Sequence, residues 1–131
     1  MARFNDTNVS AAVQPHLKSG EVMRHWAFGV RTPHFLVATV PLIYKALTKN
    51  YIVVLTNQRV LVMEMSGDLK FTSVTEYSLD SMPAVTGSVG MLFTKLHIQC
   101  PTQPSKVKFH RMGAKNNRSS SMAILEALKA A

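Results

Sequence analysis

The side chains that could perform acid–base or metal chemistry are scattered along this chain. General acid–base catalysis needs two carboxylates that converge in one cleft, and no spacing among the seven carboxylates forces that. Glu64 and Glu76 could face one another across neighbouring strands, but solvated strand positions explain both. No two histidines have the i, i+2 or i, i+4 spacing of a metal site. The residues concerned are Asp6, Glu21, Glu64, Asp68, Glu76, Asp80 and Glu126, with His16, His25, His34, His97 and His110. The sequence therefore predicts neither a catalytic pair nor a metal site.

Cys100 is the single cysteine of the chain. One cysteine can form neither an internal disulfide nor a multi-thiolate metal site, which fits a reducing cytoplasm. It precedes Pro101 on the apolar face of an expected strand, so we interpret it as a buried, inert thiol. Residues 87–90, GSVG, lack the Gly-Lys-Ser/Thr ending of a phosphate-binding loop, and we interpret them as a turn. We therefore expect no enzyme activity and no cofactor.

The polar sequence Thr56-Asn57-Gln58-Arg59 has groups that could bind a ligand. A hairpin turn explains Asn57 equally well, and Arg59 would then cover the edge of the sheet. Both interpretations stay open at this point.

The positive charges are unevenly placed along the chain. It carries 15 Lys and Arg against 7 Asp and Glu, a net charge of +8, with a pI near 10.0. Residues 95–131 hold seven basic side chains and one acidic side chain. Outward alternation along two strands would gather several of them on one surface, which suits an anionic partner or a solvated basic face. The candidate anion- or lipid-binding residues are Lys95, Lys106, Lys108, Arg111, Lys115 and Arg118.

An apolar segment lies between residues 31 and 50. Its core, Phe35 to Leu47, is interrupted by Thr39, Pro41 and Lys45 and falls short of the roughly 20 apolar residues that a bilayer span needs. It would be core if folded over the sheet, an interface if covered by another subunit, and a membrane contact if exposed. The candidate apolar contact residues are Phe35, Leu36, Leu42, Ile43 and Tyr44.

Short apolar runs predict antiparallel strands after Asn50, at 51–56, 59–65 and 69–77. The links between these runs are too short for crossover helices, and Gly67 supplies the positive φ that a tight turn needs. Residues 77–86 resemble an edge or bulged strand around Pro83, and Gly87 with Gly90 indicate a loop.

Two clear alternations and a helix end the chain. Residues 92–100 direct Leu92, Thr94, Leu96, Ile98 and Cys100 to the core, and residues 106–111 direct Val107 and Phe109 inward. Residues 117–131 lack Gly and Pro and form an amphipathic helix with Met122, Leu125 and Leu128 on one face, capped by Asn117 or Ser119. A first strand at 21–30 brings the total to about seven strands.

The length of 131 residues leaves little room for a second core, so we expect one domain. Residues 1–20 form an N-terminal extension or short helix capped by Asn5 or Asp6. Residues 21–131 form the domain, with the apolar insert at 31–50. A composition of 47% hydrophobic and 17% charged residues is typical of a packed chain.

Several of these segments resemble the bacterial pleckstrin-homology-like domains. They are Gly20-Glu21, YIVVLTNQRVLV at 51–62, Tyr77-Ser78-Leu79 and Val85-Thr86-Gly87, with LTNQR the most specific. The resemblance covers roughly residues 20 to 130 and implies a mainly β fold, an antiparallel barrel or sandwich of about seven strands capped by one C-terminal α-helix. It also implies a non-enzymatic and often oligomeric domain. The insert at 31–50 is longer than the usual link in that family.

The expected function is a binding or scaffold module that self-associates and lies on the inner face of the cytoplasmic membrane through its basic surface. Its partners would be anionic lipid headgroups or a protein. The alternative is a nucleic-acid-binding protein that uses the basic surface at 95–118, with Phe93, Phe109 and His110 stacking on bases. The polar N-terminus lacks the apolar run of an export signal, so we expect a cytoplasmic location.

Overall fold

The strands form one antiparallel sheet, with helices on both of its faces. The structure is a computed structural model and describes residues 4–31, 49–67 and 69–131. The elements of this part of the chain are α1 (Asp6–Val13), β1 (Met23–Arg31), β2 (Lys49–Thr56), β3 (Arg59–Met65), β4 (Phe71–Ser78), β5 (Val85–Val89), β6 (Phe93–Ile98), β7 (Ser105–His110) and α3 (Asn117–Ala130). Short 3-10 turns lie at Gln14–His16 and Leu79–Ser81.

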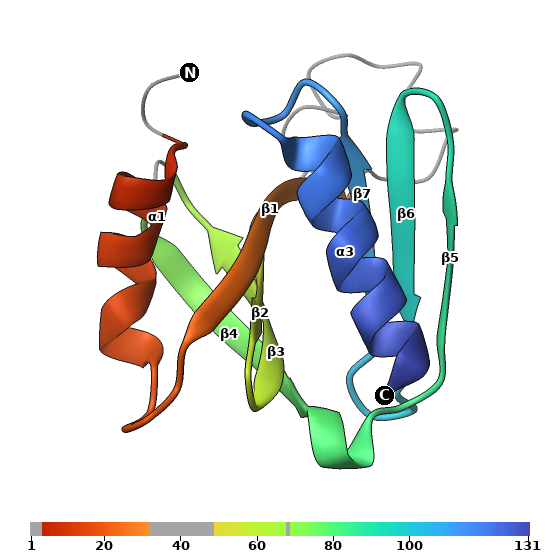
Figure 1. The fold of residues 1–131 in the computed structure, drawn as a ribbon, viewed down its shortest axis with the longest axis horizontal. Helices are drawn as coiled ribbons and strands as arrows, with labels where there is room; N and C mark the ends of the chain where they lie inside the picture. Colours follow the sequence, from red (N-terminus) through yellow and green to blue (C-terminus); the bar gives the residue numbers. More distant parts are fainter. Residues whose placement is uncertain (1–3, 32–48, 68) are drawn as a thin grey trace.

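The strand order β4-β3-β2-β1-β7-β6-β5 divides the sheet into two halves, a four-stranded meander β1–β4 and a three-stranded meander β5–β7. They meet where Val30 of β1 pairs with Lys108 of β7. Gly29 permits this crossing, since a Cβ there would lie 2.2 Å from Cγ1 of Val107. Figure 1 shows α3 against the β5–β7 half and α1 beside the β1–β4 half. The expected seven-stranded antiparallel sheet with a C-terminal helix is confirmed.

Strands β2 and β3 are buried on both faces, which explains why their sequences are continuously apolar rather than alternating. One set of side chains enters an inner cluster with α3, and the other enters an outer cluster with α1. The inner set is Val53, Leu55, Val60 and Val62, and the outer set is Ile52, Val54, Leu61 and Met63.

Helix α1 is the short N-terminal helix that the sequence predicts. Asn5 caps it by accepting a hydrogen bond from the backbone N–H of Asn8 at 2.8 Å. Val9 and Val13, one turn apart, are fully buried in the outer cluster. Asp6 accepts a hydrogen bond from the indole N–H of Trp26 at 2.8 Å, which ties the helix to β1.

Helix α3 covers the inner cluster with Ile124, Leu125 and Leu128. The predicted caps are wrong, because the N-cap is Asn116, in the left-handed region at φ 59°. Asn117 is buried and bridges strands instead. Its amide donates to the carbonyls of Phe28 and His110, and its carbonyl accepts from the N–H of Phe28.

The region after β4 differs from the prediction. Residues 77–86 contain the end of β4 and a 3-10 turn, and the strand β5 begins only at Val85. Gly87 lies inside β5 rather than in a loop. A Cβ there would lie 2.3 Å from the carbonyl oxygen of Lys95 and 2.7 Å from the side chain of Leu125, so glycine allows β5 to approach β6 and α3.

The apolar insert lies largely outside the described residues, since β1 ends at Arg31 and β2 begins at Lys49. The candidate contacts Phe35, Leu36, Leu42, Ile43 and Tyr44 all fall in this range. Among the described helices, none is long and apolar enough to cross a membrane.

Candidate functional site

A row of basic side chains lies on the outer face of the β6–β7 pair. The antiparallel register places Lys95 directly opposite Lys108, and His97 directly opposite Lys106. Their neighbours in sequence, Leu96 and Val107, point to the inner cluster, as the predicted alternation requires. Three of the six predicted anion-binding residues therefore share one face.

Like charges directly opposite one another destabilise a strand pair. The strands β5, β6 and β7 contain no Asp or Glu that could relieve the repulsion between Lys95 and Lys108. Among the residues that the structure describes, no carboxylate forms an ion pair with Lys95, Lys106 or Lys108. A bound anion would remove this repulsion.

These side chains line a groove of about 690 Å³, which we call the basic groove. The end of β1 contributes Arg31 to it, and β5 contributes the hydroxyls of Thr86 and Ser88. Thr86 pairs with His97, and Ser88 pairs with Lys95, so hydroxyl donors stand beside the cations. The full lining is Val30, Arg31, Thr86, Gly87, Ser88, Lys95, Leu96, His97, Lys106, Val107 and Lys108. Cations with hydroxyl donors are suited to phosphate oxygens.

An aromatic pair continues the basic groove toward the β5–β6 turn. The rings of Phe93 and His110 pack edge to face with centroids 5.0 Å apart. The ammonium of Lys108 lies 5.3 Å from the centre of the Phe93 ring, within the range of a cation–π contact. Lys108 therefore both lines the basic groove and contacts the aromatic pair.

The other three predicted anion-binding residues do not line the basic groove. Arg111 follows β7, and its backbone N–H donates to the carbonyl of Leu92 at 2.9 Å. Lys115 borders a different hollow, beside Trp26 and the start of α1. Arg118 is exposed in the first turn of α3. Arg111 and Lys115 lie in the β7–α3 loop, and Arg118 lies just after it in α3.

Arg59 and Glu21 form a buried ion pair that the sequence analysis missed. The Arg59 guanidinium donates to both carboxylate oxygens of Glu21, at 2.8 and 2.9 Å. It also pairs with Glu76 and donates to the backbone carbonyl of His16 at 2.8 Å. The side chains of Arg59 and Glu21 are 9% and 0% exposed. Glu21 and Arg59 lie 38 positions apart, so no local pattern could have linked them.

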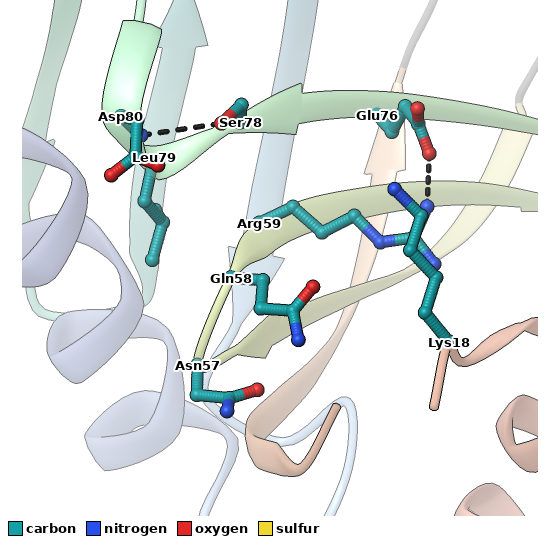
Figure 2. Close-up of a pocket in the computed structure, with 8 residues that line it drawn as sticks. All are labelled: Lys18, Asn57, Gln58, Arg59, Glu76, Ser78, Leu79 and Asp80. Atoms are coloured by element: carbon teal, nitrogen blue, oxygen red, sulfur yellow. Dashed lines mark hydrogen bonds and ion pairs between the residues drawn. The ribbon is translucent and has the colours of Figure 1, made fainter. Parts of the chain in front are cut away.

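The ion pair shifts the pKa values of both of its members. Hydrogen bonds from Arg59 lower the pKa of Glu21 from 4.5 to about 2, against the opposing effect of burial. The hydrogen bond with Glu21 raises the pKa of Arg59 further. A polar pocket of about 340 Å³ lies beside the pair, and Figure 2 shows Arg59 reaching Glu76 there.

In the Thr56–Arg59 turn, the side chains of Thr56, Asn57 and Arg59 form hydrogen bonds within the protein. The Thr56 hydroxyl accepts from the backbone N–H groups of Gln58 and Arg59 and donates to Glu21. The Asn57 amide bonds to the backbone of Gly20 and Val22. This geometry favours the hairpin interpretation over a ligand site, and Arg59 anchors the N-terminal segment rather than covering an edge.

The other side chains considered for catalysis or metal binding do not form a site. Glu64 and Glu76 do not face one another, because Glu64 is opposite Ser73 and Glu76 is opposite Leu61. Cys100 is only half buried, so its interpretation as a buried thiol is wrong. A hydrogen bond with the Thr102 hydroxyl lowers its pKa. Within the described ranges, no three His, Cys, Asp or Glu side chains could hold a metal ion.

The solved structures that resemble this chain include the following two. One is the Vps36 N-terminal PH domain, with 18% sequence identity, 87% of this chain and 83% of that chain covered, and a TM-score of 0.47. The other is the hSac2 domain from human phosphoinositide phosphatase Sac2, with 11% identity, 93% and 76% covered, and a TM-score of 0.52. No protein-family model and no curated protein matches the chain. The seven-stranded antiparallel sheet with its C-terminal helix is a pleckstrin-homology-like fold.

Proposed function

We propose that this protein is a non-enzymatic binding module whose basic groove holds phosphate groups of anionic lipids at a membrane surface. The pleckstrin-homology-like fold suggests a binding module. The observation that carries the proposal is the Lys95–Lys108 pair with Lys106 and Arg31 in the same groove, on a half of the sheet without carboxylates. A lysine near an anionic membrane contributes about 1 kcal/mol, so a few together hold a small domain reversibly.

The phosphate of a nucleic acid is the rival ligand, and the aromatic residues argue against it. Of the three rings expected to stack on bases, Phe109 is 1% exposed and belongs to the inner cluster. Phe93 packs against His110 and Lys108, so its ring is already engaged. Among the described residues that line the basic groove there is no Phe, Tyr or Trp, and such a lining suits headgroups better than single strands.

We also propose a family, a cellular location and a mode of self-association for this protein. The LTNQR turn and the other quoted segments support a place among the bacterial pleckstrin-homology-like domains. Such a module would act in the cytoplasm, on the inner face of the membrane. We also propose that the protein self-associates through the free edge of β4, which lies at the end of the sheet opposite to β5.

The test is sedimentation with phosphatidylcholine vesicles that contain or lack phosphatidylserine. We expect salt-sensitive binding only to the anionic vesicles. Replacing Lys95, Lys106 and Lys108 by Ser should weaken it about a hundredfold, at about 1 kcal/mol for each lysine. A matched variant, Lys18→Ser with Lys70→Ser and Arg24→Ser, loses the same charge at residues that do not line the basic groove and should bind nearly as wild type.

Three results would contradict the proposal. The first is an absence of binding to anionic vesicles. The second is an equal loss in both triple variants, which would reduce the effect to net charge. The third is tighter binding to a single-stranded oligodeoxythymidine than to the vesicles in the same buffer, which would favour the nucleic-acid alternative.

A further inference from the structure

The exposed apolar side chains are concentrated at one end of the molecule. Among the described residues, six large apolar side chains are more than a third exposed, and four of them lie in the β5–β6 turn region and the β7–α3 loop. We call these four the apolar tip. They are Val89, Met91, Leu92 and Met112, which are 42%, 78%, 52% and 76% exposed.

Backbone hydrogen bonds hold the apolar tip together. The N–H of Gly90 donates to the carbonyl of Phe93 at 2.8 Å, which closes the turn that carries Met91 and Leu92. The N–H of Arg111 donates to the carbonyl of Leu92 at 2.9 Å, so the β7–α3 loop lies against the turn. Figure 1 shows this turn and this loop at the same end of the molecule.

Along the outer face of β6 and β7, the side chains are first basic, then aromatic and finally apolar on the way from the basic groove to the apolar tip. Lys95 and Lys108 come first, then the aromatic pair Phe93 and His110, then Met91 and Leu92 at the turn. At about 3.3 Å per residue in β6, Phe93 lies about 7 Å from Lys95, and Met91 and Leu92 lie in the turn beyond Phe93. Interfacial segments bury their apolar side to a depth of about 5–10 Å, with amphipathic rings at the boundary and cations at the headgroups.

The positive charge around the apolar tip favours contact with an anionic surface. Arg111 precedes Met112, and Lys115 and Arg118 follow it, whereas residues 81–125 contain no carboxylate. Four side chains cannot supply the roughly 800 Å² per partner of a standard protein interface. A lipid surface needs no such area, because a few apolar side chains and nearby cations act together.

We propose that the apolar tip inserts into the interfacial layer of an anionic bilayer, so that β6 and β7 meet the membrane with the β5–β6 turn leading. This inference rests on the proposed lipid binding and adds the orientation of the protein and an apolar, salt-resistant part of its affinity. Arg111, Lys115 and Arg118 then lie at the headgroups around the tip, outside the basic groove.

The test places an environment-sensitive nitrobenzoxadiazole label at the tip of the full chain. Cys100→Ser removes the native thiol, and Met91→Cys supplies the labelling position. Gln58→Cys, in the β2–β3 turn at the other end of the sheet, is the control (Figure 1). With phosphatidylserine-containing vesicles we expect a blue shift and a brighter signal from the label at 91 only.

A second measurement separates insertion from charge. Met91→Ser, Leu92→Ser and Met112→Ser together should lower vesicle affinity about tenfold at high salt, because the buried apolar area is lost. Val22→Ser with Val74→Ser removes exposed apolar side chains elsewhere and should leave that affinity unchanged.

The outcomes distinguish the two proposals. If the labelled protein does not sediment with anionic vesicles, the proposed function fails, and this inference fails with it. If it sediments without a blue shift at 91, or with equal shifts at 91 and 58, lipid binding stands and the inserted tip is wrong. Unchanged high-salt affinity in the Met91, Leu92 and Met112 variant would also overturn the insertion.

Discussion

Arg59 uses its guanidinium to join three segments of the chain. It contacts Glu21 before β1, the backbone of His16, and Glu76 on β4. The two carboxylates differ in environment, since the Glu21 side chain is fully buried and the Glu76 side chain is 55% exposed. A buried ion pair that loses one partner leaves an uncompensated charge, whereas an exposed pair is screened by water. Glu21 is therefore the partner on which stability depends.

Replacing Glu21 by Gln should lower the free energy of unfolding by about 3 kcal/mol at neutral pH, because Arg59 would keep its charge in a buried site. Glu76→Gln removes a carboxylate from the same arginine and should cost less than about 1 kcal/mol. Urea denaturation of both variants measures the difference. Equal losses would show that burial of Glu21 does not control the strength of the pair.

The contribution of Glu21 should also depend on pH in one direction. Its pKa is lowered from 4.5 to about 2 in the folded protein, so the stabilisation is fully present above about pH 4.5 and is lost as the pH falls toward 2. The difference in unfolding free energy between wild type and Glu21→Gln should shrink over that window. A constant difference across it would contradict the assignment of the shift to Glu21.

At the scale of elements, the β1–β4 half of the sheet needs cover on both faces. Its outer apolar side chains pack under α1, which has only eight residues. A helix of this length is marginal in isolation, so packing and capping must hold it in place. Helix α1 and the outer face thus stabilise each other, and the segment before β1 is part of the packed structure.

Val13→Ala should lower the free energy of unfolding by about 2 kcal/mol, because a fully buried side chain on α1 would be truncated. Ala11→Ser changes an exposed position of the same helix and should cost no more than about 0.5 kcal/mol. Urea denaturation measures both. If Val13→Ala were as mild as Ala11→Ser, the outer cluster would not depend on α1.

At the scale of the whole molecule, the two halves of the sheet differ in charge. Glu21, Glu64 and Glu76 all belong to the β1–β4 half or the segment that leads into it, whereas β5, β6 and β7 contain no carboxylate. Such a distribution orients a protein in the field of an anionic surface, with the β5–β7 half toward it. In the strand order, β4 lies at the edge opposite to β5, and this is the edge through which we propose that two copies pair.

Sedimentation velocity tests the proposed self-association. We expect a species heavier than the 14.5 kDa monomer that becomes monomeric with Val74→Lys, since a lysine on an edge strand opposes pairing. Gln58→Lys adds the same charge at an exposed turn and should leave the assembly intact. A wild-type protein that stays monomeric at all concentrations would exclude self-association.

The sequence by itself determined the elements whose signals are local. The runs at 51–56 and 59–65, the alternations around Leu96 and Val107, and the C-terminal helix lie within a residue or two of β2, β3, β6, β7 and α3. Side-chain periodicity and tight turns arise from neighbours along the chain, so they can be identified from the sequence alone. The outward positions of Lys95, Lys106 and Lys108 followed from the same periodicity.

Only the tertiary structure decided which distant residues meet. It brought Arg31 to the basic groove, joined Glu21 to Arg59, turned Asn117 from a cap into a bridge between strands, and set Gly87 inside β5. It also gathered Met91 and Met112 at one end. Each of these contacts depends on strand order and on close approach between elements, and neither quantity is encoded in the spacing of residues along one segment.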